Sequence, residues 1–265
     1  MSAVFTVCGL AALAFAAAIT LFLCLSGIPA IREIGFFKFI LGKVWNPTGA
    51  EPAYGILPFI LSSVYGTLGA VVLGVPMGIL CAAYMAKAAP RPIAAALSEA
   101  VNLLSGIPSV VYGLVGMIVL VPAVRNVFGL PDGASLFAAI LVLAIMILPS
   151  VISVSETAIK AVPREYEEGS LALGATRNET IFRVILPAAK SGIFASAVLG
   201  TGRAIGEAMA VMMVSGNVSN MPKLFKSVRF LTTAVASEMS YSSGLQRQAL
   251  FSVALVLFIF ILIIN

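Results

Sequence analysis

The sequence contains no histidine, and charged residues make up only 10% of its 265 positions. Without an imidazole there is no histidine base and no histidine metal ligand. The three cysteines, Cys8, Cys24 and Cys81, each lie in an apolar run and lack the spacing of a metal site or a disulfide framework. We expect them to pack as small apolar side chains, and we predict neither a metal site nor a catalytic site in this chain.

Nucleotide-binding and nucleic-acid-binding patterns are also missing. No Gly-x-x-x-x-Gly-Lys-Ser/Thr loop occurs, so the chain cannot hold nucleotide phosphates in that way, and no cofactor is expected on it. The net charge is +5, but the basic residues are scattered over several loops, which argues against a nucleic-acid partner. If the protein takes part in active transport, ATP and Mg must be bound by an ATPase on another polypeptide.

Hydrophobic residues, in contrast, make up 60% of the chain. A soluble domain of this size cannot bury so much apolar surface, so the surrounding solvent must be lipid. The apolar runs are too continuous for the alternating strands of a membrane barrel. We predict an all-α polytopic membrane protein with six transmembrane helices, near residues 4–28, 57–86, 98–121, 134–156, 191–215 and 246–264.

The distribution of basic residues does not orient these spans. The loops after the second and fourth spans hold seven lysines and arginines, and the loops after the first, third and fifth hold eight. The positive-inside rule therefore gives no preference. An even number of spans requires only that both termini lie on the same side.

A charged segment within the loop 157–190 predicts a helical elbow between the fourth and fifth spans. Gly174 has the position of a left-handed residue that ends one short helix. Thr176, with Glu179 three residues later, predicts a capping box that opens the next helix, and Pro187 is expected to close that helix. A rigid elbow at the membrane face suits a surface that receives a push from another protein. A loop that merely connects two spans is the alternative, but the matched start and stop signals argue against it.

Arg203 and Glu207 are the only charges inside the predicted hydrocarbon core. Four residues apart, they are expected to share one face of the fifth span. An ionisable group at that depth costs at least ~2.5 kcal/mol on insertion scales, so such groups usually face a cavity. The planar fork of arginine binds phosphate-like oxyanions in bidentate fashion, and Glu207 could neutralise it when the path is empty. The alternative is an intrahelical ion pair that only locks packing.

Two other predicted spans carry polar or helix-breaking residues. Pro108 frees a backbone carbonyl and is expected to bend the third span. Ser150, Ser153 and Thr157 form a polar stripe on the fourth span. Either feature could line a path, but ordinary packing kinks and interhelical hydrogen bonds explain them equally well.

The elbow resembles the EAA motif of ABC-importer permeases. Glu168-Gly-Ser is followed by three residues, Gly174, nine residues and Val184-Ile-Leu-Pro187. In that family the loop is a coupling helix that docks in a groove of a cytoplasmic ATPase. The resemblance implies a type I (MetI-like) importer fold with this loop and both termini in the cytoplasm.

The resemblance also assigns roles within the elbow. It implies ATPase coupling through Glu165, Glu167, Glu168, Gly174, Thr176 and Glu179. Taken from the residues alone, the first three carboxylates could equally face a basic cleft on a partner or simply keep the elbow soluble.

Four further motifs resemble the phosphate-specific ABC importer family, and its PstC-type permeases more than its PstA-type permeases. They lie at 102–113, 143–150, 161–164 and 202–210. The resemblance runs from about residue 55 to 265 and implies a permease core at 55–265, preceded by a first transmembrane helix and an external loop at 1–54. In that family the residues matching Arg203 and Glu207 are implicated in phosphate passage.

The resemblance implies a multi-pass transport subunit, not an enzyme, in the cell (inner) membrane of a bacterium or archaeon. Its expected partners are a homologous PstA-type permease, two copies of a cytoplasmic ATPase, an external phosphate-binding protein, phosphate and the lipid bilayer. Sulfate, molybdate and tungstate are alternative substrates, because an arginine suits any oxyanion. A passive channel, an ion-coupled carrier and a membrane scaffold that signals phosphate status are alternatives of other classes.

Overall fold

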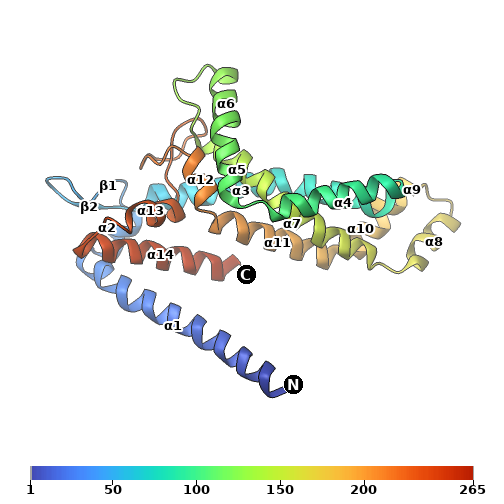
Figure 1. Ribbon diagram of the computed structural model, residues 1–265, viewed down its shortest axis with the longest axis horizontal. Helices are drawn as coiled ribbons and strands as arrows, with labels where there is room; N and C mark the ends of the chain where they lie inside the picture. The colour runs from blue at the N-terminus through green and yellow to red at the C-terminus, as the bar shows by residue number, and fades with distance from the viewer. Residues whose placement is uncertain (1, 265) are drawn as a thin grey trace.

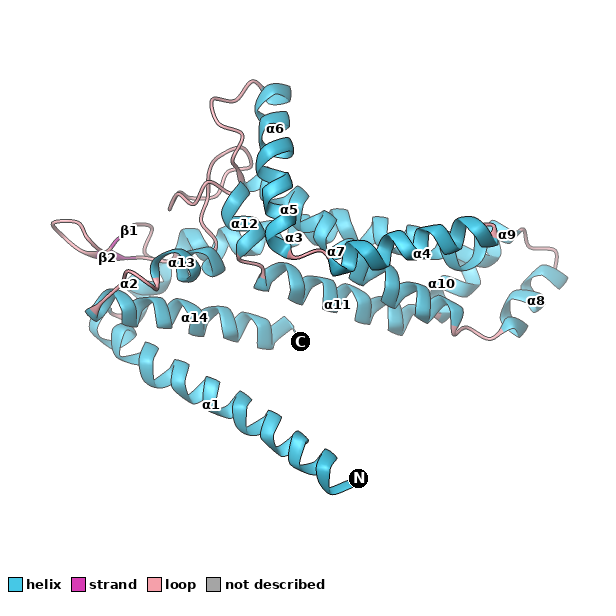
Figure 2. Ribbon diagram, viewed as in Figure 1, coloured by secondary structure: helices cyan, strands magenta, loops and turns pink. Residues whose placement is uncertain are grey.

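The computed structural model describes residues 2–264, and helices account for most of them (Figure 1). The long helices are α1 (Ser2–Ile34), α3 (Leu57–Ala83), α4 (Arg91–Gly106), α7 (Leu136–Lys160), α11 (Lys190–Gly206) and α14 (Gly244–Ile264). The short ones are α2 (Phe36–Leu41), α5 (Ser109–Val115), α6 (Val121–Phe128), α8 (Arg164–Ala172), α9 (Arg177–Thr180), α10 (Leu186–Ala188), α12 (Met209–Val214) and α13 (Leu231–Glu238). Strands β1 (Trp45–Asn46) and β2 (Ala53–Tyr54) form a small antiparallel hairpin (Figure 2).

Five helices are long and apolar enough to cross a membrane, and a bent pair, Arg177–Ala188 with Lys190–Gly206, gives a sixth if it counts as one span. The predicted all-α polytopic class is therefore confirmed. The third span differs from its prediction at 98–121, because the chain leaves the helical conformation at Ile107, directly before Pro108. Proline disfavours the α conformation in the residue before it, so α4 ends at Gly106 and the membrane-length helix covers 109–128 instead.

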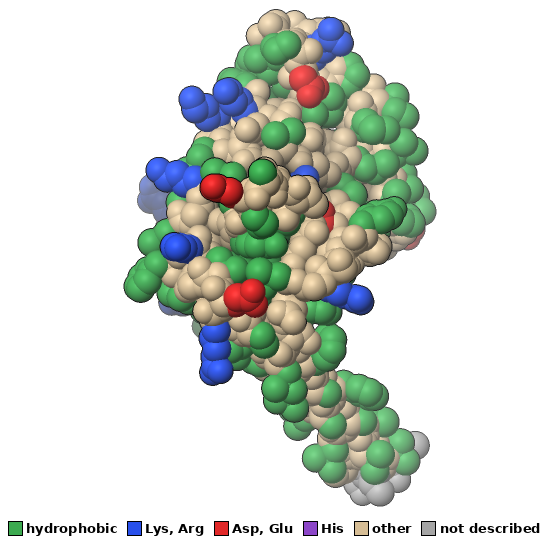
Figure 3. Space-filling model, turned by 90° about the vertical axis from the view of Figure 1, so that its left-hand side faces the viewer, with side chains coloured by type: hydrophobic (Ala, Val, Ile, Leu, Met, Phe, Trp, Pro, Cys, Tyr) green, Lys and Arg blue, Asp and Glu red, His purple; other side chains and the backbone are tan. Residues whose placement is uncertain are grey.

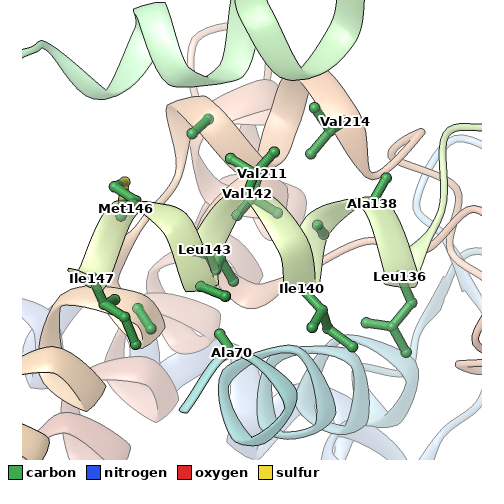
Figure 4. Packing of buried hydrophobic residues seen from close by; sticks show 14 of the residues in the cluster. Ala70, Leu136, Ala138, Ile140, Val142, Leu143, Met146, Ile147, Val211 and Val214 are labelled. Atoms are coloured by element: carbon green, nitrogen blue, oxygen red, sulfur yellow. The ribbon is translucent and has the colours of Figure 1, made fainter. Parts of the chain in front are cut away.

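Helix α7 is the centre of the packed core. On one side of the helix, Leu143 and Ile147 pack toward α3, which carries Ala70 (Figure 4). On the opposite side, Val142 lies against Val211 of α12. Glycines allow this close approach. A Cβ on Gly74 would lie 2.8 Å from Ile147, which is closer than real Cβ contacts permit. The fold thus holds α3 and α7 together as one block.

Three π turns interrupt the helices, η1 (Tyr84–Ala88), η2 (Gly116–Leu120) and η3 (Ile181–Ile185). Each ends two residues before a proline, namely Pro90, Pro122 and Pro187. Proline lacks an N–H and its ring crowds the carbonyl four residues earlier, and a wider turn just before it relieves that crowding. The elbow helix therefore continues through Pro187 and ends at Ala188, one residue later than predicted.

The N-terminal segment joins the body through a shared apolar cluster, through α14 and through one carboxylate. The Ser252 hydroxyl of α14 donates to the Gly27 carbonyl of α1 at 2.6 Å. The indole Nε1–H of Trp45, in β1, donates to Glu238 at 3.1 Å, and Arg229 forms an ion pair with the same carboxylate. The rest of α1 extends from the body as a largely apolar rod, which suits contact with lipid (Figure 3).

The end of the molecule opposite α8 and α9 is basic. Its exposed charged residues are Arg32, Lys38, Lys43, Arg125, Lys223, Lys226 and Arg247, against Glu33, Glu51 and Asp132. Figure 3 looks onto this end of the molecule and shows basic side chains projecting along one edge. Such an excess of positive charge raises the local concentration of anions.

Candidate functional site: a helical elbow and a broken span

The elbow, residues 161–189, has the predicted shape. Helix α8 is followed by Gly174 with φ +88°, in the left-handed region that glycine adopts most readily. The Thr176 hydroxyl accepts from the Glu179 N–H, and the Glu179 carboxylate accepts from the Thr176 N–H at 2.9 Å. This is the predicted capping box, and it opens helix α9.

The hydrogen bonds of the capping box also change the pKa of Glu179. The pKa of Glu179 is lowered below its ordinary value, first by the backbone N–H of Thr176 and then by the Thr176 hydroxyl. Because both donors favour the carboxylate form, Glu179 keeps its negative charge near the start of α9, where the helix dipole also favours an anion.

A second set of contacts ties the elbow to another part of the chain. The Lys87 ammonium, in η1 at the end of the second span, lies 2.7 Å from the Glu167 carboxylate of α8. The Arg177 guanidinium of α9 donates to the Lys87 carbonyl. Within the elbow, the Ser170 and Thr180 hydroxyls are hydrogen-bonded at 2.9 Å. Both short helices of the elbow therefore attach to one residue of the second span.

The three acidic residues at the start of the elbow have different surroundings. Glu165 and Glu168 are exposed, whereas the Glu167 side chain is 25% exposed and paired with Lys87. Leu173, at the tip of the elbow, is 91% exposed. Tyr166 and Leu171 of α8 are exposed as well, so the elbow carries several large apolar side chains near its exposed carboxylates, a combination that suits a protein partner.

The predicted fifth span, 191–215, is broken at Glu207. Helix α11 ends at Gly206, the Glu207 backbone is extended with φ −73° and ψ 127°, and α12 begins at Met209. The expectation that Arg203 and Glu207 share a helix face was therefore wrong, because the helical repeat does not continue across Gly206. Nor do the two residues form an ion pair in the part of the chain that the structure describes.

Each of the two charged residues instead has partners of its own. Arg203, in the last turn of α11, donates from Nη1 to the Ser150 hydroxyl of α7 at 3.0 Å. The Glu207 carboxylate accepts from the Ala210 N–H at 3.0 Å, which caps α12. The Glu207 carbonyl accepts from the Thr232 hydroxyl of α13 at 2.8 Å. A local cap and a tertiary hydrogen bond thus satisfy polar groups that the break exposes.

This arrangement leaves a cation with spare donors inside a span. Arg203 is half-buried, and a guanidinium has five N–H donors, of which the structure commits one to Ser150. The remaining donors can hold an oxyanion in bidentate fashion. Among residues 2–264 there is no group of three or more acidic, cysteine or histidine side chains that could hold a metal ion.

The sequence does not indicate the observed roles of three residues of these sites. It shows Ser150 only as part of a polar stripe and Lys87 only as one of the basic residues of its loops. For Thr232 it gives no signal, because nothing near this residue in sequence indicates a partner 25 residues away. Gly206, beside a charged residue in a glycine-rich stretch, was the one local signal for the break.

Comparisons with known proteins match most of the chain. A family profile described as "Binding-protein-dependent transport system inner membrane component" matches residues 74–265. A "Probable ABC transporter permease protein YqgH" of Bacillus subtilis (strain 168) is 39% identical, over 98% of this chain and 87% of that protein. A "Phosphate transport system permease protein PstC" of Pasteurella multocida (strain Pm70) is 33% identical, over 84% of this chain and 75% of that protein. The protein with the same description from Haemophilus influenzae (strain Rd) is also 33% identical, over 92% and 82%.

Solved structures share the fold. A chain of the MetNI methionine ABC transporter, in inward-facing conformations, has a TM-score of 0.58 and 22% identity, and the match covers 79% of this chain and 89% of that one. A chain of an amino acid ABC transporter with histidines has a TM-score of 0.55 and 21% identity, covering 79% and 88%. These neighbours confirm the predicted MetI-like permease fold.

Proposed function

We propose that this chain, which belongs to the family of binding-protein-dependent transport system inner membrane components, is one of two permease subunits of an ATP-driven phosphate importer. As a member of that family it is a multi-pass permease subunit of an ABC importer in the inner membrane. It is not itself an enzyme, and the importer needs a separate ATPase and a substrate-binding protein. Phosphate as substrate and a PstA-type permease as the second subunit are the specific parts of the proposal.

The observation that carries the proposal is Arg203. It presents spare N–H donors from the last turn of α11, beside a break in a membrane span. An oxyanion that reaches this point meets a permanent positive charge, while Glu207 is held four residues away by the start of α12. The excess of basic residues at the end opposite the elbow supports the same reading, because it draws anions toward the protein.

The elbow is proposed to be the surface that receives the ATPase. Exposed Leu173 supplies an apolar contact, exposed Glu165 and Glu168 supply charge for a basic groove, and Gly174 with the capping box fixes the shape of the elbow. With the elbow on the ATPase side, we propose that the elbow and both termini lie in the cytoplasm. A cysteine at position 173 should then react with a membrane-impermeant thiol reagent only in inside-out vesicles, and reaction in right-side-out vesicles would reverse the orientation.

The test of the substrate is uptake of radiolabelled phosphate by the complete complex, with excess sulfate and molybdate as competitors. We expect native uptake to resist both competitors and to fall about ten- to a hundredfold in Arg203→Gln, since a charge-assisted hydrogen bond contributes about 1.5–3 kcal/mol. Arg91→Gln is the matched control, because Arg91, the first residue of α4, is an exposed arginine outside both the site and the basic end. Suppression by sulfate or molybdate would reassign the substrate, and normal uptake in Arg203→Gln would make Arg203 a packing residue.

A further inference from the structure

Lys87 occupies an unusual position between the elbow and the rest of the fold. It lies 80 residues before Glu167 and 90 before Arg177, yet it contacts both. Its side chain is 13% exposed, and the Glu167 side chain is 25% exposed, so water screens this ion pair less than an ordinary surface pair. Glu167 lies on α8 and Arg177 on α9, so Lys87 holds both helices of the elbow at once.

The elbow is built to move as one piece. The Ser170–Thr180 hydrogen bond joins α8 to the helix that follows, and the capping box of Thr176 and Glu179 fixes the start of that helix. Along the chain, however, the elbow connects only to α7 and α11. Any displacement of the elbow reaches these two helices through covalent bonds, whereas it reaches the second span, α3 with η1, through non-covalent contacts such as those of Lys87.

We propose that Lys87 is a positioning residue for energy coupling: it links the elbow to the second span, so that α3 moves with the elbow when the ATPase pushes on it. This inference rests on the proposed function, because it assumes that the elbow is the surface that receives the ATPase. The two contacts of Lys87 hold different helices of the elbow. The ion pair to Glu167 resists separation of α8 from η1, and the Arg177 contact to the backbone holds α9 to the same point.

A second lysine at the same end of the molecule supplies a matched comparison. Lys160 pairs with Glu156 one helical turn earlier, at 2.6 Å, but the Lys160 side chain is 58% exposed. That pair lies within α7 and bridges no separate elements. Removing it takes away one ion pair and one positive charge without disconnecting the elbow.

The experiment measures phosphate transported per ATP hydrolysed by the complete, reconstituted complex. The variants are Lys87→Met, Glu167→Gln, Lys160→Met and the double exchange Lys87→Glu with Glu167→Lys. We expect Lys87→Met and Glu167→Gln to hydrolyse ATP at near-native rates while transport per ATP falls about tenfold, the size expected for a charge-assisted contact. Lys160→Met should remain coupled, and the double exchange should recover most of the lost coupling.

The outcomes separate this inference from the function on which it rests. If the native complex takes up no phosphate, the proposed function fails. If native uptake is present and Lys87→Met stays coupled, or loses ATP hydrolysis and transport in equal proportion, the inference is overturned. A loss of coupling that the double exchange does not restore also overturns it, because a pair that positions two elements should tolerate reversal of its charges.

Cross-linking tests the contact independently of transport. Cysteines at 87 and 167, in a chain whose Cys8, Cys24 and Cys81 are replaced by serine, should be joined by a short bifunctional thiol reagent. The joined protein should regain coupling relative to the unjoined double variant. Failure to cross-link in folded, membrane-inserted protein would contradict the geometry, and cross-linking without recovery would show that the link does not transmit the movement.

Discussion

The elbow and the break at Glu207 are both interruptions between helices, but they are held in different ways. In the elbow, Thr176 and Glu179, three residues apart, form the capping box of α9, and Gly174 adopts the left-handed conformation of the turn before it. The break has one comparable local contact, from the Ala210 N–H to the Glu207 carboxylate, but its other partners, Ser150 and Thr232, lie on helices that are remote in sequence. Local contacts thus set the internal shape of the elbow, whereas the break also depends on tertiary contacts. Substitutions of the capping residues should therefore change the shape of the elbow locally, and substitutions of Ser150 or Thr232 should change the break from a distance in sequence.

The largest effect is expected at Arg203. Arg203→Lys keeps the positive charge but loses the planar fork that binds an oxyanion and a hydroxyl together, so phosphate uptake should fall at least about tenfold. Uptake by the complete complex at equal membrane abundance is the measurement, and Arg91→Lys is the control. Native uptake in Arg203→Lys would mean that charge alone suffices at the break.

A smaller effect is expected at Thr232 of α13, whose hydroxyl donates to the Glu207 carbonyl at the break. Thr232→Val keeps the shape of the side chain but leaves the Glu207 carbonyl without its donor, and an unpaired buried polar group costs about 1–3 kcal/mol. Thr232→Ser retains the hydroxyl and should stay close to native. Thermal unfolding in detergent compares the two variants. Equal stability of the valine and serine variants would show that another group satisfies the carbonyl.

In the elbow, Gly174→Ala tests whether local conformation governs the shape. Nothing lies within 4 Å of a Cβ added at Gly174, so the cost of about 1–2 kcal/mol comes from its positive φ alone. Gly169→Ala is the matched control. A Cβ there also meets nothing within 4 Å, but Gly169 lies inside α8, where alanine is the better helix former. Amide hydrogen exchange across 164–180 should rise in the first variant and not in the second.

The smallest effect concerns pH. Because the pKa of Glu179 is lowered in the folded protein, its carboxylate adds stability that is present above the ordinary pKa of a glutamate and is lost as pH falls through the folded value. Glu179→Gln has no such charge to lose. The native advantage in protection of the Thr176 and Glu179 amides should therefore disappear in acid, and an advantage that persists there would assign the cap to neutral hydrogen bonds.

The sequence was sufficient to predict the features that depend on residues close together in the chain or on the overall hydropathy of a segment. Long apolar runs predicted the membrane class, and the spacing of Thr176 and Glu179 predicted the capping box. The shared face of Arg203 and Glu207 was predicted by extending a 3.6-residue repeat across Gly206, where the backbone leaves the helix. The partners of Arg203 and Lys87 could not be predicted, because 53 and 80 residues separate the groups that meet.

The π turns have a mechanical consequence. Two of them adjoin the unit formed by α8 and α9: η1 contains Lys87, which contacts both helices, and η3 directly follows α9. Each holds one residue more than an α-turn, and taking up that residue would rotate the following helix by about 100° and shift it by about 1.5 Å. The unit of α8 and α9 thus lies between two π turns, η1 and η3, whose conformation can change by exchanging a few backbone hydrogen bonds. We therefore expect movement of α8 and α9 to be taken up by rotation at these turns rather than by bending of the long spans.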